Sequence, residues 1–89
     1  MELHFPEAGS LKGKRKHVKS AKAQLQNRFG ASVAEVDHQN QWQRAAIGVA
    51  VIGSSESQVR EVLASVERFV VAAADIELLD VERAWLESE

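Results

Sequence analysis

The sequence has no cysteine, a single proline, few glycines and no long hydrophobic run. The absence of cysteine excludes a disulfide framework, a thiolate zinc site and a thiol nucleophile, and it suits a reducing cytosol. No apolar stretch reaches the ~18 residues of a membrane-spanning helix, and residues 1–4 do not resemble a signal peptide, so we expect neither a membrane span nor Sec export. The scarcity of glycine and proline leaves no linker. We therefore expect one cytoplasmic domain over residues 1–89.

Charge is unevenly distributed along the chain, although the net charge is only −2. Residues 1–30 contain seven Lys and Arg side chains against two carboxylates, whereas residues 31–89 contain four against eleven. The N-terminal third is therefore net positive, and the rest is net negative. A positive segment in an otherwise acidic chain points to an anionic partner.

Hydrophobic periodicity predicts six elements of secondary structure. Strands are expected over residues 2–5, 32–39, 42–52 and 76–83, and helices over 11–29 and 56–73. Ser10 is the expected N-cap of the first helix, and Gly30 is its expected C-terminal stop. The core-facing stripe of that helix consists of Leu11, Val18, Ala21, Leu25 and Phe29. The β-α-β-β-α-β order predicts an α+β fold, a ferredoxin-like split βαββαβ sandwich with a four-stranded antiparallel sheet and two helices on one face.

In that fold the first and third strands are central, and the strand order is fourth, first, third, second. Alternation along the strands assigns each side chain to one of two faces. The residues expected to face the helices are Val36, Ile47, Val49 and Val51. Those expected on the open face are Arg44, Ala46, Gly48 and Ala50, beside Glu2, His4, Glu35 and Asp37.

The first helix carries the strongest functional signal. At about 100° per residue, five cations occupy one arc beside the apolar stripe. They are Lys12, Arg15, Lys16, Lys19 and Lys22. No acidic residue occurs between positions 8 and 34, so the partners for ion pairs along the helix are missing. Such an arc is typical of a surface that binds RNA phosphates or another anion. The alternative is a solvated face whose lysines aid solubility or meet the acidic part of the chain.

The connection between the second and third strands contains further candidates: Asp37, His38, Trp42 and Arg44. With residue 39 opposite residue 42, Asp37 is expected to face Arg44 as a cross-strand ion pair. Asp37 and His38 should point to opposite faces as strand neighbours, which excludes a direct relay for general base chemistry. We expect Trp42 to serve the structure or an interface, and the alternative is that a base stacks on its indole.

Motifs of catalysis and metal binding are missing. His4, His17 and His38 have no metal-ligand spacing, so we expect surface or hairpin side chains. No phosphate-binding glycine loop and no nucleophile elbow occur, so we expect no enzyme, no cofactor and no metal. The small open-face residues of the third strand are also unable to form the aromatic platform of RNA-recognition motifs. If the protein binds RNA, we expect the first helix to make the contact.

Several segments of the chain resemble the YlxP-like family, also called domain of unknown function 503. They are E-L-H-F-P at residues 2–6, S-L-K-G-K-R at 10–15, V-K-S at 18–20, R-F at 28–29, S-V-A-E-V-D-H-Q at 32–39 and W-Q-R-A at 42–45. The resemblance implies a small bacterial cytoplasmic protein with a ferredoxin-like fold. Genes of this family often accompany those of translation and ribosome maturation, which has led to comparison with ribosome-binding factor A. Against the family pattern, the apolar residues that usually precede E-L-H are missing, so we expect either a trimmed start or a shortened first strand. In addition, Gly13 replaces a glutamate that would complete a capping box with Ser10.

These observations together predict a non-enzymatic accessory of bacterial translation or ribosome maturation that binds structured RNA or ribosomal particles through its basic first helix. The alternative is a homodimeric or protein-interaction module that uses the open sheet face and Trp42, without nucleic acid. A small-molecule sensor is a third interpretation, which rests on fold analogy alone.

Overall fold

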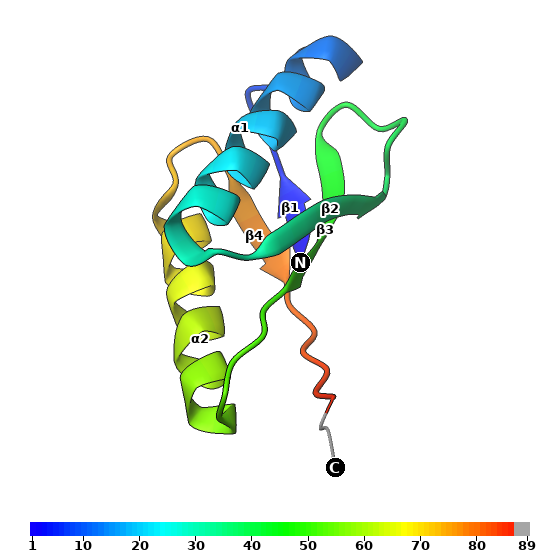
Figure 1. Ribbon diagram of the computed structural model, residues 1–89. Helices are drawn as coiled ribbons and strands as arrows, with labels where there is room; N and C mark the ends of the chain where they lie inside the picture. Colours follow the sequence, from blue (N-terminus) through cyan, green and yellow to red (C-terminus); the bar gives the residue numbers. More distant parts are fainter. Residues whose placement is uncertain (87–89) are drawn as a thin grey trace.

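A computed structural model describes residues 1–86, so residues 87–89 of the predicted domain lie outside the described part. In chain order the elements are β1 (Glu2–His4), α1 (Leu11–Phe29), β2 (Ser32–Asp37), β3 (Arg44–Ala50), α2 (Glu56–Ala72) and β4 (Glu77–Asp80) (Figure 1). All strand pairs are antiparallel, and the order in the sheet is β2-β3-β1-β4. The predicted α+β architecture and strand order are confirmed.

Helix α1 begins and ends where the sequence predicts. At its N-terminus, Ser10 Oγ accepts a hydrogen bond from the Gly13 backbone N–H at 3.0 Å. At its C-terminus, Gly30 has a left-handed backbone with φ of 62°, and its N–H donates to the Gln26 carbonyl at 3.0 Å. Glycine adopts this conformation at little cost because it has no Cβ. The resulting turn directs the chain into β2.

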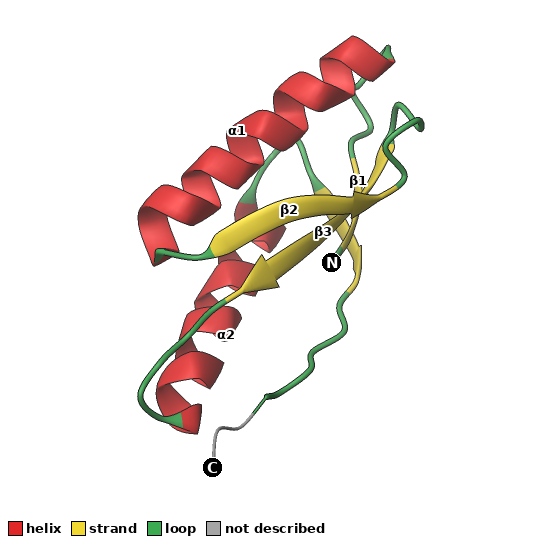
Figure 2. Ribbon diagram, turned by 45° about the vertical axis from the view of Figure 1, so that its right-hand side comes forward, coloured by secondary structure: helices red, strands yellow, loops and turns green. Residues whose placement is uncertain are grey.

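Both helices cover one face of the sheet (Figure 2). Their buried side chains join those of the central strands in one core that includes Leu3, Phe5, Val18, Leu25, Ile47, Val66 and Val70. Helix α1 packs against the edge strand β2, and α2 packs against β4 at the opposite edge. The helices lie more end to end than side by side, and the molecule measures 45 × 22 × 20 Å (Figure 1).

The strands are shorter than predicted. Strand β2 ends at Asp37, because its register with β3 shifts between Glu35 and Asp37 and because His38 adopts a left-handed φ of 63°. Strand β3 begins only at Arg44, so Trp42 lies in the connecting loop rather than in a strand. Strand β4 and the C-terminal end of β3 are also a few residues shorter.

Two residues of β2 lie on the face opposite to the predicted one. Glu35 pairs with the core residue Ile47, so its side chain points toward the helices. Val36 is on the open face and is 61% exposed, and its Cγ1 lies 3.3 Å from the position of a Cβ added at Gly48. The predicted register, with residue 39 opposite residue 42, is wrong by one position here. A slip of one residue turns every side chain of a strand to the other face.

Candidate nucleic-acid interface

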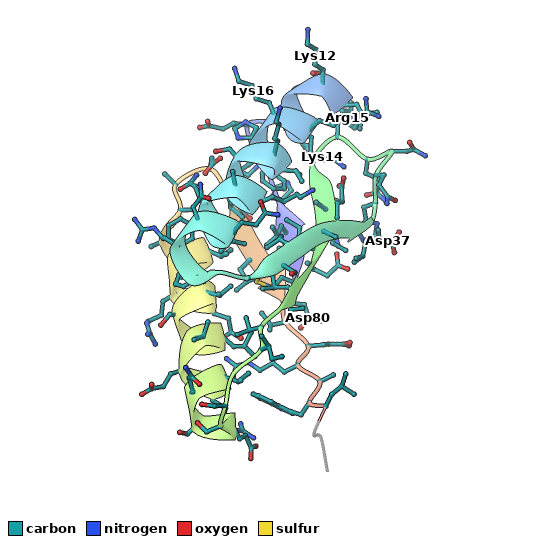
Figure 3. The ribbon with its side chains drawn as sticks, in the orientation of Figure 1. Lys12, Lys14, Arg15, Lys16, Asp37 and Asp80 are labelled. Atoms are coloured by element: carbon teal, nitrogen blue, oxygen red, sulfur yellow. The ribbon has the colours of Figure 1, made fainter. Side chains whose placement is uncertain are left out.

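The five cations predicted to bind RNA lie together on the surface of α1, and we call them the basic arc: Lys12, Arg15, Lys16, Lys19 and Lys22. Four of them are exposed, and Lys22 is half-buried. Within residues 1–86, none of the five forms an ion pair with a carboxylate. Figure 3 shows Lys12 and Lys16 pointing away from the sheet at the outer end of α1. The basic arc is therefore open to an anionic partner.

The basic arc is on the flank of α1 that faces away from α2. On the other flank, His17 Nδ1 lies 2.7 Å from Asp75 Oδ2 in the loop that follows α2. Arg28 covers the ring of Phe69 in α2, with its guanidinium carbon 4.7 Å from the ring centre. The first turn of α1 contains no acidic residue. The positive end of the helix dipole and the side chain of Lys12 therefore favour an anion at the same place.

Lys14 was not among the residues that the sequence pattern indicated, yet it is a charged side chain buried completely, with 0% exposed. Its Nζ donates hydrogen bonds to Glu35 Oε2 at 2.9 Å, to the His38 carbonyl at 2.8 Å and to the Arg44 carbonyl at 3.2 Å. A longer contact of 3.4 Å reaches the Gln39 carbonyl. The three N–H groups of the ammonium thus each have an acceptor, which offsets much of the cost of burying the charge.

The signal for this buried lysine was present in the helix pattern. Residue 14 is three positions after Leu11 and four before Val18, so it belongs to the apolar stripe of α1. A lysine in that stripe indicates a buried acceptor on the facing sheet, and Glu35 supplies it. The bonds of Lys14 reach both ends of the β2–β3 connection and fasten it to the first turns of α1, next to the basic arc (Figure 3).

The ion pairs of the β2–β3 connection differ from the predicted ones. Asp37 lies opposite Ala46 instead of Arg44, and its Oδ1 accepts a hydrogen bond from the His38 backbone N–H at 2.7 Å. Glu2 of the central strand β1 is the partner of Arg44. Its Oε2 is 3.1 Å from the guanidinium and 3.0 Å from His38 Nε2. The predicted pair between Asp37 and Arg44 is therefore wrong, because the register shift moves Asp37 past Arg44.

Asp37 and His38 form no direct relay. Their side chains are separated by 4.0 Å between Oδ1 and Nδ1, which is too long for a hydrogen bond. The exclusion of a relay holds, but its cause is the left-handed backbone of His38 and not strand alternation.

Trp42 is 57% exposed in the loop formed by residues 38–43. The neighbouring Gln43 donates from its side-chain amide to the Ala8 carbonyl at 3.2 Å, and its own carbonyl accepts from the Phe5 N–H at 2.8 Å. These bonds, together with those of Lys14, hold the loop against the segment that leads into α1. An anchored loop therefore presents the indole to solvent.

Residues 1–83 of the chain match a family described as a protein of unknown function, DUF503. The chain belongs to the DUF503 family. It is also 35% identical over 79 residues to the uncharacterized protein YlxP of Bacillus subtilis (strain 168), a match that covers 89% of this chain and 86% of that protein. The resemblance to YlxP-like proteins is thereby confirmed. Neither description states an activity, so the function of this DUF503 protein has to be argued from its surfaces.

The central strands of the DUF503 protein present no aromatic platform on the open face of the sheet. Their residues on that face are Glu2, His4, Arg44, Ala46, Gly48 and Ala50. His4 Nδ1 is 3.2 Å from a carboxylate oxygen of Glu77 in β4. Ala46 is buried, so the small-residue strip that a partner meets begins at Gly48, beside the exposed Val36. The open face of these strands therefore offers no aromatic ring on which RNA bases could stack in the manner of RNA-recognition motifs.

The histidines of residues 1–86 lie in separate segments of the DUF503 protein. Each of the three histidines contacts a carboxylate, and no group of three or more potential metal ligands occurs among the described residues. Neither α1 nor α2 has the length and hydropathy that a bilayer-spanning helix needs.

Proposed function

We propose that this DUF503 protein is a non-enzymatic cytoplasmic accessory of translation or ribosome maturation that binds structured RNA. The observation that carries the proposal is the basic arc, whose five cations have no carboxylate partner among the described residues. Cations of this kind bind phosphates and gain affinity from the release of counterions. The resemblance to YlxP-like proteins, whose genes accompany translation genes, supports the place in translation.

Contacts to phosphates position an RNA without reading its sequence. The affinity should therefore depend strongly on salt and weakly on sequence. If Lys12, Arg15, Lys16 and Lys19 each neutralise one phosphate, the logarithm of the affinity should fall with the logarithm of the salt concentration at a slope of about −2.8 to −3.6, using roughly 0.7–0.9 per contact. Titration of a ribosomal RNA fragment at several salt concentrations measures this slope.

Charge reversal on the basic arc provides the decisive variant. Lys16→Glu combined with Lys19→Glu should weaken the binding of any RNA and flatten the salt slope, and it should leave thermal stability nearly unchanged because both side chains are exposed. The control, Arg60→Glu with Arg68→Glu, changes the net charge equally on α2 and leaves the basic arc intact. Because Arg60 pairs with Glu56 and lies over the Trp85 ring, thermal unfolding of this control is measured together with its RNA binding.

The proposal fails if the Lys16 and Lys19 variant binds RNA as the original protein does, or if that protein shows no salt-dependent binding. Co-sedimentation with 30S, 50S and 70S particles tests the ribosomal part separately. We expect association that the charge reversal abolishes and that the α2 control retains. Binding to free RNA without association with any particle would contradict the place in translation.

A second candidate function is a homodimer or protein-interaction module that uses the open sheet face without nucleic acid. Two exposed side chains favour it, Val36 at 61% and Trp42 at 57%, because exposed apolar and aromatic groups mark interfaces. Light scattering at high micromolar concentration tests it. A dimer that Trp42→Ala dissociates would support this function, and a monomer mass that the substitution leaves unchanged would remove it.

A further inference from the structure

The loop of residues 38–43 stands beside the basic arc because buried bonds fix it there. Lys14 Nζ donates to the carbonyl of His38, the first residue of the loop, at 2.8 Å and to that of Arg44, which directly follows the loop, at 3.2 Å. The side-chain amide of Gln43 adds a bond to the Ala8 carbonyl, two residues before the N-cap of α1. The loop thus lies at the same end of the molecule as the first turns of α1, which carry Lys12 and Arg15 of the basic arc (Figure 3).

The side chains of this loop suit a nucleotide base. Trp42 is 57% exposed, and its ring stacks on no other ring among the described residues. Gln39, Asn40 and Gln41 are exposed amides without charge. An indole stacks on any of the four bases, and amides both donate to and accept from base edges. The centre of a protein–protein contact would favour apolar neighbours in place of three amides.

We infer that Trp42 stacks on an unpaired base of the same RNA whose phosphates the basic arc binds. The inference rests on the proposed function and narrows its substrate class. In an uninterrupted duplex each base is already stacked between its neighbours and presents no free face to an indole. The RNA that fits both surfaces is therefore a duplex with a bulge, a loop or an open end next to the backbone that α1 contacts.

The two tryptophans of the chain make the test direct. Trp85→Phe leaves Trp42 as the only indole, and Trp42→Phe leaves Trp85, whose ring centre lies 4.3 Å from the guanidinium carbon of Arg60. Each variant is titrated with two RNAs, a perfect duplex and the same duplex carrying one unpaired adenosine. We expect the second RNA to bind more tightly and to quench the fluorescence of Trp42 but not that of Trp85.

Substitution of the indole measures its share of the affinity. Trp42→Ala should weaken binding of the RNA with the unpaired base by about 5- to 150-fold, the range for loss of one stacked base. It should leave the salt slope and thermal unfolding unchanged, because the basic arc is intact and the side chain is exposed. Trp42→Phe, which keeps an aromatic face, should retain most of the preference for the unpaired base.

The results that would overturn this inference differ from those that would overturn the proposed function. Equal, salt-dependent binding of both RNAs without quenching of Trp42 overturns the inference and leaves the proposed function standing. Absence of salt-dependent binding to either RNA overturns both. If Trp42→Ala instead dissociates a dimer without changing RNA affinity, Trp42 is a protein contact and the inference is wrong.

Discussion

Replacement of Lys14 by methionine tests whether the buried ammonium stabilises the fold. The change keeps an unbranched side chain in the helix but leaves Glu35 Oε2 and the His38 and Arg44 carbonyls without the donor now at 2.9, 2.8 and 3.2 Å. Removing one partner of a buried ion pair costs about 3–5 kcal/mol. Because the Glu35 side chain is 16% exposed, water reaches part of the carboxylate. We therefore expect the lower end of that range, about 3 kcal/mol.

A loss of this size is easily measured in a small domain. It is a large share of the about 5–15 kcal/mol by which domains are stable. At about 4–8 °C per kcal/mol, it lowers Tm by roughly 12–24 °C. Urea unfolding followed by circular dichroism gives the free energy directly. The control is Lys16→Met, the same chemical change at an exposed position of α1, which should stay within about 0.5 kcal/mol of the original protein. Equal stability of the two variants would refute the buried network.

Two further substitutions test the acceptor of Lys14 and the end of α1 by the same unfolding assay. Glu35→Gln keeps an oxygen acceptor for Lys14 Nζ, so it should destabilise the protein less than Lys14→Met does. A loss of unfolding free energy larger than that of Lys14→Met would mean that the carboxylate charge, and not the hydrogen bond, stabilises the buried ammonium. Gly30→Ala should cost about 1–2 kcal/mol, because a Cβ at a φ of 62° approaches the carbonyl of its own residue, while no heavy atom of a residue distant in the sequence lies within 4 Å of that Cβ. An unchanged stability would show that the left-handed cap is not required.

The elements and their order were predictable because they depend on local signals. The stripe of α1 repeats at helical spacing, and its two ends carry the side chain and the glycine that helix termini require. Strand β3 is almost continuously apolar, as expected for a strand with neighbours on both sides. The helix stripe, the cap residues and the apolar run can each be recognised without knowledge of tertiary contacts, so a single sequence is enough to predict these elements.

The pairing of β2 with β3 was not predictable in the same way. The sequence pattern predicted a two-residue turn at Asn40 and Gln41, and the position of the turn sets the register of the whole hairpin. The actual connection is longer, because His38 is left-handed and Lys14 binds carbonyls on both sides of it. Main-chain carbonyls have the same chemistry in every residue, so the sequence carries no mark of which ones a buried lysine will bind.

The cations of the candidate site were predictable from the sequence, but the residues that surround them were not. The basic arc follows from angular position on one helix, which requires no knowledge of the rest of the fold. The place of Trp42 beside that arc depends on Gln43 and Lys14, whose bonds cross between segments far apart in the sequence. The sequence pattern accordingly placed Trp42 at the end of a strand, where it was expected to serve the structure or an interface, with base stacking as the alternative.

Helix α1 carries exposed lysines and one buried lysine, and under the proposed function the two kinds have separate consequences for RNA binding. The exposed lysines of the basic arc would act on RNA through charge alone under the proposed function, whereas Lys14 bonds the carbonyls at the two ends of the loop that carries Trp42. At temperatures where Lys14→Met remains folded, the salt slope should therefore be unchanged, since no cation of the arc is altered. Quenching of Trp42 by an RNA with an unpaired base should decrease, because a loosened loop loses more conformational entropy on stacking. A variant that kept full quenching would show that the loop is ordered without Lys14.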